Sequence, residues 1–349
     1  GRTFHSFFGL GILEGGIAKT IAKASSSSKV QSRISESTEI VIDEISMISP
    51  QAFEAAEAIA RKIKGNTTPF GGMRLILVGD FHQLPPVNPF DTTQPWLFDS
   101  DAWASLEIET ISLGQIMRTS DIEFMTVLGK VRNGLCDASV AAFLNCRKIE
   151  LPEDFSGTVL FPRKDEVESY NTKKLNRLSG TLQKFETKIT TDIKKPSELE
   201  KLLKLSPLPK VLSIKEGALV MIRKNDEGGD FANGSLGTVD GISADSISIN
   251  LLNGKRISLQ KEEFQILDAD GKVTATIVNF PLTLGWACTI HKAQGTSIER
   301  LYVSLGGLWE SGQAYVALSR ATNPDQLFIG NWTPSSIRAD SEVVAYYSK

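Results

Sequence analysis

The chain has 349 residues, of which 41% are hydrophobic and 23% charged, and its formal net charge is −3. This balance is typical of a globular protein with two or three domains, and no run of 18 apolar residues is present that could span a membrane. The negative net charge excludes nucleic-acid binding through bulk basicity, so such binding would need a local track of side chains. Three cysteines without the spacing of a disulfide framework or zinc site indicate a reducing compartment.

The chain opens with a patterned segment rather than with methionine, so we expect it to be a piece of a longer protein. Residues 3–11, which carry one histidine and three phenylalanines, are interpreted as a strand end or turn. No secretion signal is apparent there, since a basic start and a small-residue cleavage site are both missing. The serine run at 25–28 is interpreted as a solvated loop before a new element.

Two strands with polar tips follow. Residues 39–44 (EIVIDE) predict a strand buried on both faces, with Asp43 and Glu44 at its carboxyl end, where open parallel sheets bind ligands. Residues 50–63 predict a helix that begins at a proline. Residues 74–80 (RLILVGD) predict a second buried strand, followed by FHQLPPV. This alternation favours a parallel sheet with helices on both sides.

A second domain of similar build is predicted further along. Residues 108–113 are a candidate strand, and the next segment has helical periodicity from Phe124 to Val131, with Asp121 as its cap and Gly134 as its stop. The short apolar runs that predict the strands of a second sheet are 158–162, 301–305 and 326–332.

The region between these strands differs in character. Residues 184–210 are rich in lysine, threonine and proline and predict an exposed connection. Residues 206–270 contain short alternating runs divided by close turns, with Asn-Gly hairpin signals at 233 and 253. This pattern predicts a small antiparallel barrel inserted into the second domain.

Several residues suggest chemistry on a nucleotide. A nucleotide hydrolase uses a carboxylate pair like Asp43 and Glu44 to hold magnesium and activate water, although any exposed strand end can carry two acids. Gln83 is able to touch a γ-phosphate and the attacking water, or is simply a turn residue. Arg118 and Arg320 are candidate cations for the charge of a transferring phosphoryl group, or ordinary surface ion-pair residues. Residues 280–295 (FPLTLGWACTIHKAQG) gather several polar side chains beside an apolar run, or form a plain surface turn.

The order of these stretches carries a resemblance. VIDEISM, GDFHQLPPV, QIMRTSDIEF, NGSLGTV, TIHKAQG and AYVALSRAT resemble the motif series of the PIF-type DNA helicases, relatives of RecD in the 5′-to-3′ branch of helicase superfamily one. The resemblance implies an α/β fold of two RecA-like parallel-sheet motor domains, with a small Src-homology-type antiparallel β-barrel inserted in the second. The implied domains are a first motor domain at 1–114, with a small insert near 12–38, a second at 115–205 and 271–349, and the barrel at 206–270.

The same resemblance implies roles for individual residues. Asp43 would hold Mg²⁺, Glu44 would activate water, Gln83 would sense the γ-phosphate of ATP, and Arg118 and Arg320 would reach the phosphates. Gln294 and Gln313 would bind near the nucleotide and couple its state to DNA. The residues that would line or adjoin the DNA track are His5, Phe7, Phe81, His82, Thr289, His291 and Lys292.

One family motif is missing. No G-x-x-x-x-G-K-[ST] phosphate-binding loop is present, and GGIAKT at 15–20 has the wrong spacing to form one. Family order places the true loop before residue 1. We therefore expect negligible ATP turnover from these 349 residues alone.

The expected function of the intact protein is an ATP-dependent DNA helicase that moves 5′ to 3′ on single-stranded DNA in repair, recombination, replication and telomere maintenance. It would act as a monomer on single strands and on forked or structured duplexes. The alternatives are a non-catalytic single-strand-binding scaffold, or a RecD-like subunit or relaxase-linked helicase. We expect an intracellular location, either the cytoplasm of a prokaryote or the nucleus or mitochondrion of a eukaryote.

Overall fold

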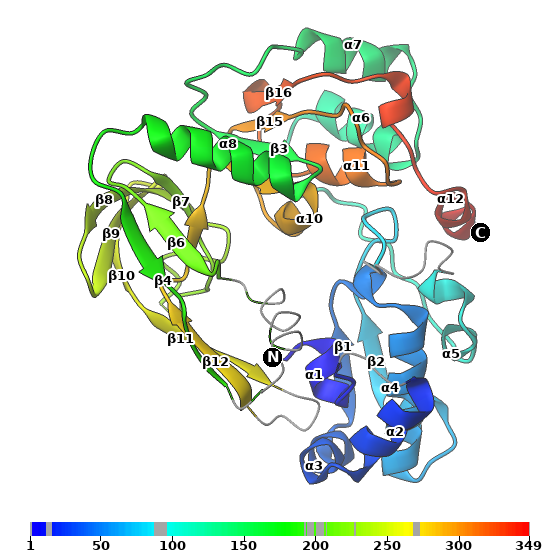
Figure 1. Ribbon diagram of the computed structural model, residues 1–349. Helices are drawn as coiled ribbons and strands as arrows, with labels where there is room; N and C mark the ends of the chain where they lie inside the picture. The colour runs from blue at the N-terminus through cyan, green and yellow to red at the C-terminus, as the bar shows by residue number, and fades with distance from the viewer. Residues whose placement is uncertain are drawn as a thin grey trace. The chain divides into compact units, whose positions relative to one another are not determined.

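The computed structural model divides into two compact units (Figure 1). Unit 1 comprises residues 1–113, 191–193 and 265–275, and unit 2 comprises residues 114–190, 194–264 and 276–349. The structure describes residues 2–11, 16–86, 96–191, 193, 199, 206, 208–226, 228–267 and 273–348. Gly15 of GGIAKT, Val87 and much of the predicted connection at 184–210 lie outside these residues.

Unit 1 begins with helices where the sequence suggested loops. The segment predicted as a strand end or turn at 3–11 is instead a helix, because the Thr3 side chain accepts a hydrogen bond from the Ser6 amide and Gly9 closes the helix in the left-handed conformation. The serine run is likewise wrong as a solvated loop, since it ends one helix and Ser27 caps the next by accepting from the Val30 amide. The regular elements of this unit are α1 (Phe4–Phe8), α2 (Ile17–Ser26), α3 (Ser28–Glu36), β1 (Glu39–Ile42), α4 (Pro50–Lys64), β2 (Arg74–Leu77) and α5 (Asp101–Ala104).

The predicted strands at 39–44 and 74–80 are confirmed as the parallel pair β1 and β2. The prediction that β1 is buried on both faces is wrong. Val41 and Ile76 are register partners on one face, and they are 62% and 37% exposed, whereas Ile42 on the opposite face is 4% exposed. Among the described residues, only that opposite face is well covered.

An aromatic core holds unit 1 together. Phe8, Phe53 and Phe70 are fully buried, and the ring centroids of Phe53 and Phe70 lie 4.9 Å apart. The helix predicted at 50–63 is confirmed as α4, which begins at Pro50 and contributes Phe53. The strand predicted at 108–113 is wrong, because this segment has no strand pairing and leaves Leu113 91% exposed.

The central sheet of unit 2 is parallel, with strand order β14-β3-β15-β16. Val159 and Tyr302 pack on one face beside α8, and Leu160 and Val303 are buried on the other, so both faces are covered. The predicted strands at 158–162, 301–305 and 326–332 are confirmed here. The bounds are β3 (Thr158–Phe161), β14 (Ala287–Thr289), β15 (Leu301–Val303) and β16 (Leu327–Ile329), with α6 (Ile122–Arg132), α7 (Ala138–Cys146), α8 (Lys164–Arg177), α10 (Ile290–Ala293), α11 (Gln313–Leu318) and α12 (Ser341–Tyr347).

The helix predicted after residue 120 is confirmed as α6. The Asp121 side chain accepts a hydrogen bond from the Phe124 amide at 2.7 Å, and Gly134 has a positive φ just beyond the helix end.

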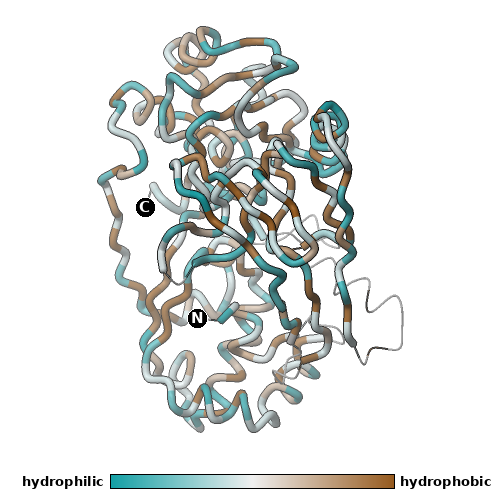
Figure 2. Tube along the Cα trace, turned by 90° about the vertical axis from the view of Figure 1, so that its left-hand side faces the viewer, coloured by the Kyte–Doolittle hydropathy of each residue, from teal (hydrophilic) through white to brown (hydrophobic). Residues whose placement is uncertain are grey.

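An antiparallel β region fills the middle of the chain, as the alternating pattern predicts. A five-stranded sheet has the order β10-β9-β8-β7-β13, and its core includes Ile214, Val220, Ile249 and Leu282. Figure 2 shows brown apolar residues interspersed with teal ones along these strands. The strand bounds are β4 (Gln183–Glu186), β5 (Lys188–Thr191), β6 (Val211–Ile214), β7 (Leu219–Ile222), β8 (Leu236–Ile242), β9 (Ser246–Leu251), β10 (Arg256–Gln260), β11 (Glu262–Leu267), β12 (Val273–Asn279) and β13 (Leu282–Leu284).

Strand pairing in this region extends beyond the predicted limits of 206–270. β4 pairs with β6, and β13 pairs with β7. The described part of the segment 184–210, which was expected to be an exposed connection, contains β5 and most of β4. The hairpin signal at Asn253 is confirmed by the β9–β10 pair, whose turn contains Gly254 with a φ of 86°. No helix in the described part of the chain has the length and apolarity needed to cross a bilayer.

A buried asparagine ties α8 to the central sheet. The Asn171 side chain donates to the Ala287 carbonyl at 3.0 Å and accepts from the Ala287 amide at 2.9 Å. Because this residue is only 8% exposed, truncating it leaves two backbone groups of β14 without partners. We expect Asn171→Ala to lower the free energy of unfolding by about 2–3 kcal/mol, measured by urea denaturation.

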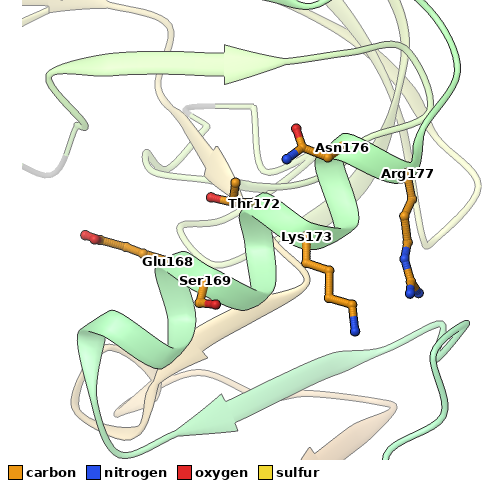
Figure 3. A pocket seen from close by; sticks show the side chains of 6 residues that line it. All are labelled: Glu168, Ser169, Thr172, Lys173, Asn176 and Arg177. Atoms are coloured by element: carbon orange, nitrogen blue, oxygen red, sulfur yellow. The ribbon is translucent and has the colours of Figure 1, made fainter.

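Asn176 is the matched control for this substitution. It lies on the exposed side of the same helix, in a shallow surface hollow with Thr172 and Lys173 (Figure 3). Asn176→Ala should change stability by less than about 0.5 kcal/mol. Equal losses for the two variants would contradict the role assigned to Asn171.

Candidate nucleotide and DNA sites

The tips of β1 and β2 lie at one edge of the sheet of unit 1. Asp43 is exposed and its Oδ1 accepts a hydrogen bond from the Glu44 amide at 2.9 Å. The Ile45 amide donates to the Val78 carbonyl at 3.0 Å, which joins the two tips. A Cβ on Gly79 would lie 2.9 Å from the Ile45 amide nitrogen, so only glycine permits this close approach.

Glu44 adopts an unusual backbone. Its φ and ψ are 50° and 47°, in the left-handed region that residues other than glycine rarely occupy. This turn starts a short 3-10 helix, η1 (Ile45–Met47), directly after the strand. Strain of this kind is concentrated at functional sites, which makes Glu44 a stronger candidate than its sequence context alone indicates.

The second tip contains Gln83 together with two predicted DNA contacts. The Gln83 Oε1 atom is buried and has no hydrogen-bond partner among the described residues, so it is an acceptor suited to a ligand or water. Phe81 is 4% exposed and packs edge-on against Phe98 and Trp103, with centroids 5.1 and 5.7 Å away. His82 is also 4% exposed.

These burial values leave Phe81 and His82 out of the DNA track that we propose below. A base stacks only on an accessible ring, and the rings of Phe98 and Trp103 pack against the ring of Phe81. The sequence did not indicate this, because Phe98 and Trp103 follow Phe81 by 17 and 22 residues in the chain.

The two other DNA-track candidates of unit 1 lie on α1. His5 is exposed and Phe7 is partly exposed, and the guanidinium of Arg33 on α3 lies 5.6 Å from the centroid of the Phe7 ring. This face of α1 therefore combines an accessible ring with a nearby cation, as a stacking surface for nucleic acid requires.

In unit 2, the TIHKAQG segment forms the end of β14 and the short helix α10. Thr289 caps this helix by accepting from the Lys292 amide at 3.3 Å, so its hydroxyl has a structural role. The His291 Nε2 atom lies 3.2 Å from a carboxylate oxygen of Glu310. Lys292 is exposed as a whole residue, but the protein around it partly desolvates its ammonium group. This desolvation lowers its pKa, and the nearby charges of Arg223 and Lys164 lower it further.

Gln313 connects this segment to α11. It is fully buried, and its Oε1 accepts from the amides of Trp309 at 3.2 Å and Glu310 at 3.4 Å. Since Glu310 in turn contacts His291, a continuous chain of contacts runs from α11 to α10. Gln294, the other predicted coupling residue, is partly exposed just after α10.

The two candidate arginines converge within unit 2. Arg118 is exposed and donates to the Ser297 hydroxyl at 3.1 Å and to the Ser319 carbonyl at 2.7 Å. Arg320 is only 3% exposed, and its guanidinium donates to the Val316 carbonyl at 2.9 Å and the Ser319 hydroxyl at 2.8 Å. Both guanidinium groups therefore lie around the end of α11.

The sequence analysis did not select three residues that lie beside the candidate site of unit 2. Glu310, Trp309 and Arg223 all lie beside the predicted cluster, yet none belongs to a stretch quoted for the resemblance. The signal for two of them was available, because WESGQ places an exposed tryptophan and an acid directly before α11.

Comparison with known proteins gives consistent matches. Residues 1–141 match the family model described as PIF1-like helicase. The chain is 42% identical to the ATP-dependent DNA helicase Pif1 of Bdellovibrio bacteriovorus, over all of this chain and 79% of that protein. It is 31% identical to the ATP-dependent DNA helicase PIF1 of Homo sapiens, over all of this chain and 54% of that protein. It thus spans about half the length of the eukaryotic relatives. The crystal structure of Pif1 helicase from Candida albicans matches with a TM-score of 0.86 at 30% identity, over all of this chain and 85% of that one.

Proposed function

Because the chain belongs to the PIF1-like helicase family, we propose that it is the catalytic part of an ATP-dependent DNA helicase that moves 5′ to 3′ along single-stranded DNA. The observation that carries this proposal is the grouping of the site residues. The acidic tip follows β1 and Gln83 follows β2, the two parallel strands of unit 1, and Arg118 and Arg320 lie around the end of α11 in unit 2. We further propose that the protein acts inside the cell, as a monomer, in genome maintenance.

Each group has a part in hydrolysis. Glu44 accepts a proton from the attacking water, and Gln83 orients that water with its unpaired Oε1. Asp43 is an exposed carboxylate, which fits Mg²⁺, since this ion is commonly held by one or two carboxylates and the phosphates of the nucleotide. Bound Mg²⁺ would neutralise charge that develops on the phosphates. Arg118 and Arg320 supply delocalised positive charge to the same step.

The DNA track is proposed to include His5 and Phe7 in unit 1 and His291 and Lys292 in unit 2. His5 and Lys292 are exposed, and Phe7 and His291 are partly exposed, so all four are accessible. The contacts that lead from Gln313 through Glu310 to His291 support a coupling between nucleotide state and this track. Forked or structured duplexes are the proposed substrates for unwinding.

The test compares this chain with a version extended at its amino end by a segment that contains a phosphate-binding loop. A loop of this kind supplies backbone amides and a lysine for the β- and γ-phosphates, which no G-x-x-x-x-G-K-[ST] sequence provides here. We expect oligothymidine to stimulate phosphate release by the extended chain and no measurable release by the chain alone, in a malachite-green assay.

Stimulated turnover by the chain alone would contradict the expected need for a phosphate-binding loop, but not the proposed ATP hydrolysis. Strand binding by the extended chain without any turnover would favour the non-catalytic scaffold, the alternative from another functional class.

A further inference from the structure

A surface hollow of about 1320 Å³ lies in unit 2 beside Arg118. Its walls are the segment 114–121, the first turns of α6 and the loop 322–325. Arg118 lines the hollow, and its guanidinium donates to the Ser319 carbonyl at the end of α11, a neighbour of α6 in this unit (Figure 1). The hollow therefore adjoins the place where the two candidate arginines meet, and it is large enough for a nucleoside.

Three apolar side chains that line the hollow are exposed. Met117 directly precedes Arg118 and is 82% exposed, Ile122 begins α6 and is 76% exposed, and Ile116 is 45% exposed. Exposed apolar residues that gather at one place on a surface mark a binding site. Met117 suits a flat ligand, because its thioether is polarisable and its unbranched side chain adapts to the face of a ring.

Several polar side chains of the hollow already bind their own backbone. The Thr119 hydroxyl accepts a hydrogen bond from the Asp121 amide at 3.3 Å, and the Asp121 carboxylate accepts from the Phe124 amide at 2.7 Å. In the loop after α11, the Asn323 Oδ1 atom accepts from the Asp325 amide at 2.9 Å. These contacts occupy acceptors that could otherwise bind the edge of a ligand, so the hollow offers mainly apolar contact.

The charges of the hollow favour one orientation for a nucleotide. Arg118 supplies positive charge, whereas Asp121 and Asp325 place carboxylates elsewhere in the lining. The arginine attracts phosphates and the two acids repel them. The hollow itself therefore suits the uncharged, flat end of a nucleotide. A DNA strand fits this arrangement less well, since it carries a phosphate at every nucleotide.

We propose that the hollow beside Arg118 receives the nucleobase of the nucleoside triphosphate, with Met117 packed against the face of the nucleobase. The proposal rests on the proposed function, in which Arg118 reaches the phosphates of ATP. The nucleobase does not change during phosphoryl transfer, so Met117 stabilises the ground state and the transition state equally. Its contribution should therefore appear in the KM for ATP and not in kcat.

The test measures DNA-stimulated phosphate release at a series of ATP concentrations, with the chain extended by a phosphate-binding loop. We expect Met117→Ala to raise the KM for ATP about five- to tenfold and to leave kcat within about twofold. Met117→Leu should restore most of the affinity, since leucine has a similar volume. Because Met117 is largely exposed, neither substitution should impair folding.

Inorganic tripolyphosphate separates the nucleobase from the phosphates, because it has a phosphate chain like that of ATP but no nucleobase. As a competitor of ATP, it should inhibit Met117→Ala with the same inhibition constant as the unmodified extended chain. Leu135→Ala is the matched control, since Leu135 is an apolar residue of the same unit that is 58% exposed and lies outside the hollow. It should leave both the KM and the inhibition constant unchanged.

The outcomes separate this proposal from the proposed function. No stimulated hydrolysis by the unmodified extended chain would overturn both. If hydrolysis is present, an unchanged KM for Met117→Ala would overturn the nucleobase site alone. An equal weakening of ATP and tripolyphosphate would overturn it too, because the substitution would then act on the phosphates.

Discussion

Replacing Arg320 with alanine is expected to lower DNA-stimulated ATP hydrolysis by about three orders of magnitude, measured as phosphate release by the chain extended with a phosphate-binding loop. An arginine that stabilises the transition state of phosphoryl transfer contributes on the order of 10³- to 10⁵-fold to turnover. The same substitution removes hydrogen bonds to the Val316 carbonyl and the Ser319 hydroxyl. It should therefore also destabilise unit 2 by roughly 2 kcal/mol.

Arg147 separates these two effects. Its guanidinium also donates to backbone carbonyls, those of Pro324 at 2.9 Å and Phe143 at 3.3 Å, but it belongs to none of the proposed sites. Arg147→Ala should cost comparable stability and leave turnover within a factor of about two. If the two variants lose turnover equally, the catalytic role of Arg320 is wrong and its contribution is structural.

Replacing Glu44 with glutamine is expected to lower turnover in the same assay by about 10²- to 10⁴-fold, with little loss of stability. The amide has the shape of the carboxylate but does not take a proton from water, so a general base is lost while packing is retained. Binding of oligothymidine should stay within about twofold of the unmodified chain, because Glu44 is not among the residues proposed for the DNA track.

Glu39→Gln provides the comparison on the same strand. Glu39 lies at the opposite end of β1 and pairs at the surface with Arg74 at 3.3 Å. Loss of that exposed pair should cost less than about 0.5 kcal/mol and leave turnover unchanged. Turnover by Glu44→Gln above a tenth of the unmodified rate would assign the base to another residue.

The sequence predicted elements well where one local signal dominated. The apolar runs at 158–162 and 301–305 became the buried strands β3 and β15, and the pattern around Asp121 located α6 with its cap. The errors arose where burial depends on distant residues. The face of β1 with Val41 looks like a core face in the sequence, yet its exposure is set by what covers the sheet.

The candidate site shows the same difference between features with a local sequence signal and features that depend on distant residues. Motif order selected the acidic tip, Arg118 and Arg320 as candidates, because each lies in a short segment with a recognisable pattern. Burial of Phe81 depends on Trp103 and Phe98, and the closeness of Arg223 to Lys292 depends on how the β region folds against α10. Neither relation has a signal in local sequence, so only the three-dimensional structure reveals them.

Glu44 has a left-handed backbone, so the residue proposed to activate water also lowers the stability of the fold. A residue with a side chain pays about 1 kcal/mol for that conformation, and glycine adopts it freely. Glycine at position 44 would remove this cost, but it would also remove the carboxylate that we propose as the general base.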